Sequence, residues 1–142
     1  MLQIKAYYSA AIRGPAGDAA TQESMNANLE KASNQASLLQ RLFGEILTIY
    51  CPHQHDRLIQ ILWKHRQVTT ESILQADLQI QNDCDMTIVN NSIPGSGVDL
   101  EIQNALNIPH PIYVIGDTIT DSDILMLATG IQQLIMSKYE NS

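Results

Sequence analysis

The sequence predicts an α/β protein with a parallel β-sheet that helices cover on both faces. Short strand-like segments alternate with amphipathic helical segments along the chain. Each strand-like segment is apolar throughout, as in sheets buried on both faces, rather than alternating polar and apolar. The 142 residues are enough for one domain with a substantial core. We therefore expect residues 1–142 to form a single domain.

The first half of the chain predicts two strands and a long helix. The segment LQIKAYY, residues 2–8, is the first strand, and the loop SAAIRGPAGD follows it. A helix is expected over residues 19–43 and should end at Gly44. A second strand over residues 45–51 and a short helix, RLIQILWKHR, complete this half. The apolar positions of the long helix recur every three to four residues, at Leu29, Ala32, Ala36, Leu39 and Phe43.

The second half continues the alternation. A helix over residues 70–83, which Thr69 or Thr70 can cap, precedes a strand over residues 86–91. A glycine-bearing loop and a short helix follow, then the strand PIYVIGD and a last helix, SDILMLATGIQQLIM. Ligands of such sheets bind at the carboxyl ends of the strands. The loops after residues 8, 51, 91 and 117 should therefore form the site.

The composition of the chain limits the kinds of partner that it can bind. The 15 acidic residues outnumber the 8 lysines and arginines, which gives a formal charge of -7. A nucleic acid polymer needs a basic patch and is not expected, although one arginine in a cleft can serve a small anion. No apolar run is long enough for a bilayer, and the N-terminus lacks the design of a signal peptide. Two cysteines do not make a disulfide scaffold. We expect a cytoplasmic protein with no membrane partner.

Glu101 is the first candidate functional residue. It follows the glycine-bearing loop and lies about 40° beyond Ala105 on a helical projection, at the margin of the apolar stripe. The nearby helix N-terminus favours its ionised form, which a nucleophile or an electrostatic stabiliser requires. The alternative is a solvated helix acid. The apolar stripe itself comprises Val98, Ile102, Ala105 and Leu106.

Asp77 is the second candidate, because it lies within the stripe formed by Ile73, Ile80 and Cys84. An unpaired buried carboxylate is costly, so it must be paired, protonated or next to a cavity. Desolvation would raise its pKa, which suits a general acid; the alternative is a structural acid that accepts hydrogen bonds from backbone amides. Two acids in different environments are the usual equipment for breaking a glycosidic bond.

The loop after the first strand predicts an anion site. Arg13 offers a planar fork for phosphate, and Gly14 allows the backbone to approach a ligand. The pattern is neither a P-loop nor a dinucleotide fingerprint, and a loop arginine can equally be a surface ion-pair partner. Tyr7 and Tyr8 end the strand, and one of them must point inward. His53 and His55 lack an evident third ligand, so no metal is expected.

Three segments, in order, resemble the nucleoside 2-deoxyribosyltransferase superfamily, and most closely its 2'-deoxynucleoside 5'-phosphate N-hydrolase branch. They are YYSAAIRGP, ADLQIQNDCDMTIVNN and PGSGVDLEIQNA. The resemblance implies a flavodoxin-like three-layer fold with about five strands. It also implies that Glu101 is the nucleophile at C1', that Asp77 is its catalytic partner and that Tyr7 positions the nucleophile or the sugar. Substrate and phosphate contacts are implied for Ser9, Ile12, Arg13, Gly14, Gly95, Ser96 and Gly97.

The chain departs from the N-hydrolase pattern at three positions. Ala11 and Gly95 stand where relatives have serine, and Leu125 stands where a contact to the partner subunit is usual. The resemblance implies no cofactor and a homodimer or a higher even oligomer. The last helix also carries more apolar side chains than one sheet face needs.

The predicted function is hydrolysis of the base–sugar bond of a (deoxy)nucleoside 5'-monophosphate. A deoxyribosyltransferase, which hands the sugar to a second base, is the enzyme alternative. The other alternative is a nucleotide-binding module without catalysis. Fold class does not separate the three.

Overall fold

The computed structural model describes residues 3–11, 19–52, 58, 61–62, 64–92 and 96–141, apart from the side chains of residues 70, 96 and 97. Within these ranges the strands are β1 (Ile4–Ser9), β2 (Leu47–Tyr50), β3 (Met86–Asn90) and β4 (Ile112–Ile115). They form one sheet in the order β2-β1-β3-β4, and every neighbouring pair is parallel. The predicted α/β class and flavodoxin-like layering are confirmed, with four strands in the described residues rather than five.

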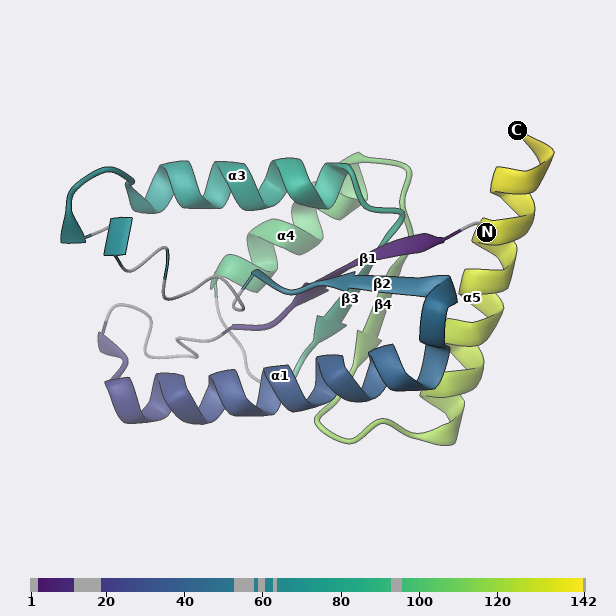
Figure 1. The fold of residues 1–142 in the computed structure, drawn as a ribbon, viewed down its shortest axis with the longest axis horizontal. Helices are drawn as coiled ribbons and strands as arrows, with labels where there is room; N and C mark the ends of the chain where they lie inside the picture. Colours follow the sequence, from purple (N-terminus) through teal and green to yellow (C-terminus); the bar gives the residue numbers. More distant parts are fainter. Residues whose placement is uncertain are drawn as a thin grey trace.

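Helices cover both faces of this sheet (Figure 1). Helix α1 (Gln22–Phe43) lies on one side, and α3 (Thr70–Asn82) and α4 (Ser96–Asn107) lie on the other. Helix α5 (Asp121–Glu140) packs into the same core as α1. The arrangement leaves the carboxyl end of β1 between α1 on one face and the α3–α4 pair on the other.

The main core fills the space between the sheet and α1 with α5. Every second residue of β1 points into it, since successive side chains of a strand face opposite ways. Burying aliphatic side chains such as these stabilises the fold by about 1.5–3 kcal/mol each. The core comprises Ile4, Ala6, Tyr8, Ala32, Ala36, Leu39, Leu47, Cys51, Met86, Ile88, Ile115, Leu127 and Ile131.

Local signals in the sequence account for several helix ends. The Thr69 hydroxyl accepts a hydrogen bond from the Ser72 amide at 3.0 Å, so Thr69 caps α3 as one of the two expected residues. Gly44 ends α1 with a φ of 59°, which a residue without a Cβ tolerates. Residues 44–46 then form a short 3₁₀ helix, η2 (Gly44–Ile46), so the strand predicted from residue 45 begins at Leu47. Of the helix predicted over 57–66, residues 58, 61, 62 and 64 are helical, residues 65 and 66 form a turn, and the other four lie outside the described residues.

The β4 side of the sheet is more open than the sequence predicts. Val114 on β4 is 48% exposed, and Leu106 on α4 is 72% exposed although it was expected in the buried stripe. Both residues lie at or near the edge strand, where no further strand is found among the described residues. Side chains at such an edge have no neighbouring strand to cover them.

Candidate functional site

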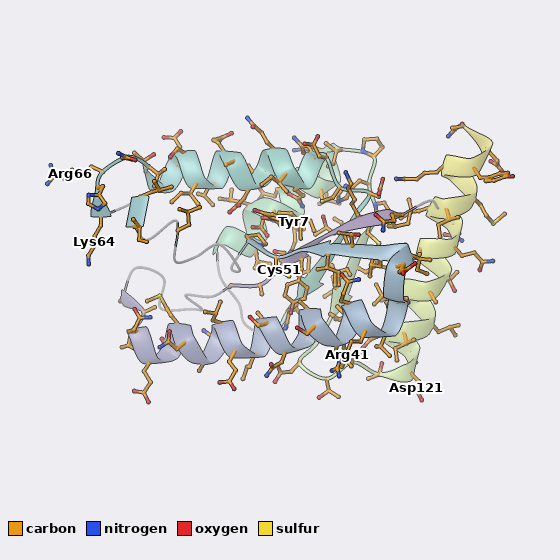
Figure 2. The ribbon with its side chains drawn as sticks, viewed as in Figure 1. Tyr7, Arg41, Cys51, Lys64, Arg66 and Asp121 are labelled. Carbon is orange, nitrogen blue, oxygen red and sulfur yellow. The ribbon has the colours of Figure 1, made fainter. Side chains whose placement is uncertain are left out.

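The candidate site lies where β1 ends, on the face of the sheet that α3 and α4 cover. Tyr7 lies on this side of β1 (Figure 2). Tyr8, the next residue, joins the core on the α1 side. Both tyrosines are fully buried, because the sheet has no solvent-facing side at this point. At least one of them was expected to point inward, and both are buried, on opposite faces of the sheet.

Tyr7 contacts Glu101 directly. The Tyr7 hydroxyl donates a hydrogen bond to Glu101 Oε1 at 3.0 Å, joining residues 94 positions apart in the sequence. A phenol that donates to a carboxyl fixes its orientation and favours its charged form. The pair thus joins the end of β1 to α4.

Glu101 faces the sheet because of its place on α4. Val98 and Ala105 are buried against the sheet, and Glu101 lies three residues after one and four before the other, on the same helical line. The exposure of Leu106 shows that this line is turned relative to the predicted stripe. Glu101 is thus a half-buried member of the packed line rather than a residue at its margin.

Burial controls the charge of Glu101. Removal of the carboxyl from water raises its pKa from 4.5 to about 7 and outweighs every other effect. Ser9 and Tyr7 oppose the increase by stabilising the carboxylate, and the charge of Asp77 adds to it. The expectation that the helix N-terminus keeps Glu101 ionised is therefore corrected: near pH 7 both protonation states are present.

Ser9 and Asp77 also contribute to the environment of the Glu101 carboxyl. The Ser9 hydroxyl is buried and makes no hydrogen bond of ordinary geometry to any residue that the structure describes, but it is near enough to lower the pKa of Glu101. Asp77 is half-buried on α3, as expected from its stripe. Its charge raises the pKa values of Tyr7, Tyr50 and Glu101. The three predicted catalytic residues are thus within electrostatic reach of one another.

Tyr50 is a site residue that the sequence analysis missed. It is the register partner of Tyr7 on the neighbouring strand β2, and the two ring centroids are 5.8 Å apart in a tilted arrangement. Its ring is half-buried beside the site. The signal was present in the sequence, because two parallel strands that each carry a tyrosine near the carboxyl end place both tyrosines at the same end of the sheet.

A second polar cluster lies at the same end of the strands, on the opposite face of the sheet. The Tyr8 hydroxyl donates to Gln35 Oε1 at 2.5 Å, and Asn90 Nδ2 donates to Gln35 Oε1 at 3.0 Å. The Gln35 amide donates in turn to the Gly116 carbonyl at 2.7 Å. Ser92 Oγ donates to Asn90 Oδ1 at 2.6 Å. The cluster ties the ends of β1, β3 and β4 to α1.

Most of the predicted phosphate-binding positions lie outside the described residues. These are Ile12, Arg13, Gly14 and Gly95, whereas Ser96 and Gly97 form the first turn of α4. His53 and His55 are also outside the described ranges. Among the residues that the structure does describe, no group of three or more His, Cys, Asp or Glu side chains is arranged to hold a metal ion.

The described helices include none with the length and apolar character needed to cross a bilayer. Comparison of the chain with protein-family models, with curated proteins and with solved structures finds no match.

Proposed function

We propose that the protein cleaves the bond between base and sugar in a (deoxy)nucleoside 5'-monophosphate. The observation that carries the proposal is the Tyr7–Glu101 hydrogen bond at the carboxyl end of β1, with Asp77 acting electrostatically on both groups. A carboxylate aligned by a phenol and accompanied by a second acid supports nucleophilic displacement at an anomeric carbon. Folds with a parallel sheet also bind their ligands at the carboxyl ends of the strands.

In the proposed mechanism the Glu101 carboxylate attacks C1' and the bond from C1' to the base nitrogen breaks. The electron pair leaves with the base, which takes up a proton as it departs. A water molecule then attacks C1' of the glycosyl-enzyme, gives up a proton and releases the sugar phosphate, which restores the carboxylate. Tyr7 holds the attacking oxygen in line, and Asp77 is the catalytic partner that orients the sugar or moves a proton.

The raised pKa of Glu101 fits this chemistry. A carboxylate removed from water is poorly solvated, so it is more reactive than an exposed one once it is ionised. With a pKa of about 7, the ionised fraction at pH 8 is still large. Turnover that depends on this carboxylate should therefore rise with pH through about pH 7 and level off above it.

The experiment that tests the proposal is a panel of nucleosides and their 5'-monophosphates, with and without an acceptor base, in which release of free base is followed. Release without an acceptor supports hydrolysis, and exchange only with an acceptor supports transfer. Binding without release supports a nucleotide-binding module, and the enzymatic proposal then fails. Glu101→Gln is the matched inactive control, because it keeps the shape of the side chain and the acceptor for Tyr7.

Arg13 separates phosphorylated from plain substrates. A charge-assisted hydrogen bond of guanidinium to phosphate is worth about 1.5–3 kcal/mol, so its loss should raise KM for the monophosphate by about 10- to 150-fold. Arg13→Ala should leave the plain nucleoside almost unaffected. Equal losses on both substrates would remove the monophosphate assignment and favour the transferase.

A further inference from the structure

Gln81 is a fully buried polar residue that the proposed mechanism does not use. It lies on α3 one turn after Asp77 and faces the space between α3, β3 and α4. An uncharged amide in such a position is tolerated only when its donors and acceptors are satisfied. Its partners therefore indicate what it does.

The Gln81 amide joins three elements. Its Nε2 donates to Thr87 Oγ1 on β3 at 2.9 Å and to the backbone carbonyl of Glu101 on α4 at 2.9 Å. Its Oε1 accepts from Asn104 Nδ2, one turn further along α4, at 2.9 Å. Both hydrogens of the amide and its oxygen are therefore engaged, and two of the three bonds go to the helix that carries Glu101.

The orientation of the Gln81 amide is fixed by a chain of hydrogen bonds in which each donor and acceptor can be assigned in only one way. His110 Nδ1 lies 3.2 Å from the Cys84 carbonyl, which only accepts, so Nδ1 carries the proton. Burial lowers the pKa of His110, which keeps the ring neutral and leaves Nε2 as an acceptor. The Thr87 hydroxyl, 2.6 Å from Nε2, then donates to it. Thr87 Oγ1 is left to accept from Gln81, whose NH₂ group must therefore point toward β3 and Glu101.

We propose that Gln81 is a positioning residue that holds the turn of α4 bearing Glu101 at a fixed height above the end of β1. The role rests on the proposed function of Glu101 but acts through the backbone, without contact to a substrate. Tyr7 fixes the carboxyl from the β1 side, and Gln81 fixes the carbonyl of the same residue from the β3 and α3 side. Thr87 and neutral His110 set the direction of the amide that makes this contact.

The test is Gln81→Met, which keeps the length and volume of the side chain and removes both polar functions. Gln79→Met is the matched control, because Gln79 lies on the same helix and is exposed. A shift of about 1 Å in a reacting group costs on the order of 100-fold in rate. Gln81→Met should therefore lower kcat by about 10- to 100-fold while KM changes by less than about threefold. The control should keep wild-type values of both.

A second readout does not depend on turnover. Carboxyl-¹³C NMR of labelled glutamate, assigned with Glu101→Gln, follows the titration of Glu101 itself. Because loss of water is the main reason for its raised pKa, release of the α4 turn should let water in. The pKa of Glu101 in Gln81→Met should then fall below about 7, toward the ordinary value of 4.5. The control should titrate as the wild type does.

The outcomes separate this inference from the proposed function. Wild-type kcat together with a wild-type Glu101 titration in folded Gln81→Met overturns the positioning role. An altered titration in Gln81→Met, in a protein whose wild type releases no base from any substrate, overturns the proposed function and supports the positioning role. If Gln81→Met does not fold, Thr87→Val decides by the same two measurements. Thr87→Val should lower kcat and the pKa of Glu101 by smaller amounts than those expected for Gln81→Met. Wild-type values of both in Thr87→Val would then overturn the positioning role of Gln81.

Discussion

Replacing Glu101 with glutamine should stabilise the protein, and increasingly so as the pH rises. Glutamine has the same shape, its Oε1 can still accept from the Tyr7 hydroxyl, and it never becomes charged. Glu101 has a pKa of about 7 in the folded protein against an ordinary value of 4.5. Its ionisation in the folded state therefore opposes folding, which is a common property of functional acids.

The size of the effect follows from proton linkage. Between pH 4.5 and about 7 the folded protein holds a proton on Glu101 that the unfolded chain has released. The free energy of unfolding therefore falls as the pH rises through this window and stays at the lower value above it. Each pH unit is worth about 1.4 kcal/mol, so the loss attributable to Glu101 is on the order of 3 kcal/mol. Glu101→Gln removes this loss.

The assay is urea unfolding of the wild type and Glu101→Gln at pH 4.5 and at pH 8. The difference between the two proteins should grow by about 3 kcal/mol from the lower to the higher pH. Glu30→Gln, at an exposed position of α1, is the control and should show no such growth. A difference between wild type and Glu101→Gln that is the same at both pH values would refute the reasoning, because Glu101 would then have an ordinary pKa in the folded protein.

Three further predictions concern the same site and its assembly. Tyr7→Phe removes a hydrogen bond to the Glu101 carboxylate that is worth about 1.5–3 kcal/mol. The pKa of Glu101, and with it the midpoint of the acidic side of the pH profile of kcat/KM, should therefore rise by about 1 to 2 pH units. An unchanged midpoint would contradict the hydrogen bond between Tyr7 and Glu101. Asp77→Asn removes a repulsive charge and should lower the pKa values of Tyr50 and Glu101 while slowing turnover more than it lowers Tm; a large fall in Tm with unchanged activity per folded molecule indicates a structural acid. Leu125 is 69% exposed on α5, and Leu125→Lys should shift the expected even oligomer toward monomer in sedimentation analysis, whereas a wild type that is already monomeric at micromolar concentration contradicts the assembly.

The pattern of apolar residues predicted the layers of the fold, because a helix or strand that is buried in such a layer needs apolar side chains at regular spacing. The buried apolar positions of α1, Ala32, Ala36 and Leu39, were all among those expected. The same reasoning was wrong for Leu106, which is exposed near the edge strand β4. A helical projection shows which residues share a face but not where the sheet beneath that face ends, and this is set by the number of strands that pair.

The candidate acids could be found from the sequence, but their charge states could not. The helix N-terminus near Glu101 is visible in the residue order, and it favours the carboxylate. Desolvation is stronger here, and it arises only when folding buries the carboxyl. Gln81 was missed for a related reason. Glutamine is usually a surface residue, and nothing in its neighbours shows that its amide is buried between three elements.

The end of β1 is held from both faces, and this is what makes a positioned carboxyl possible there. Tyr7 and Ser9 face the Glu101 side, while Tyr8 between them donates to Gln35 on α1. The Gln35 amide also holds the Gly116 carbonyl at the end of β4. A strand end fixed on only one face could tilt toward or away from Glu101, and a tilt of even 1 Å would break a 3.0 Å hydrogen bond. The cluster around Gln35 therefore contributes to the geometry of a site it does not touch, because it keeps the Tyr7 hydroxyl at the height that Glu101 requires.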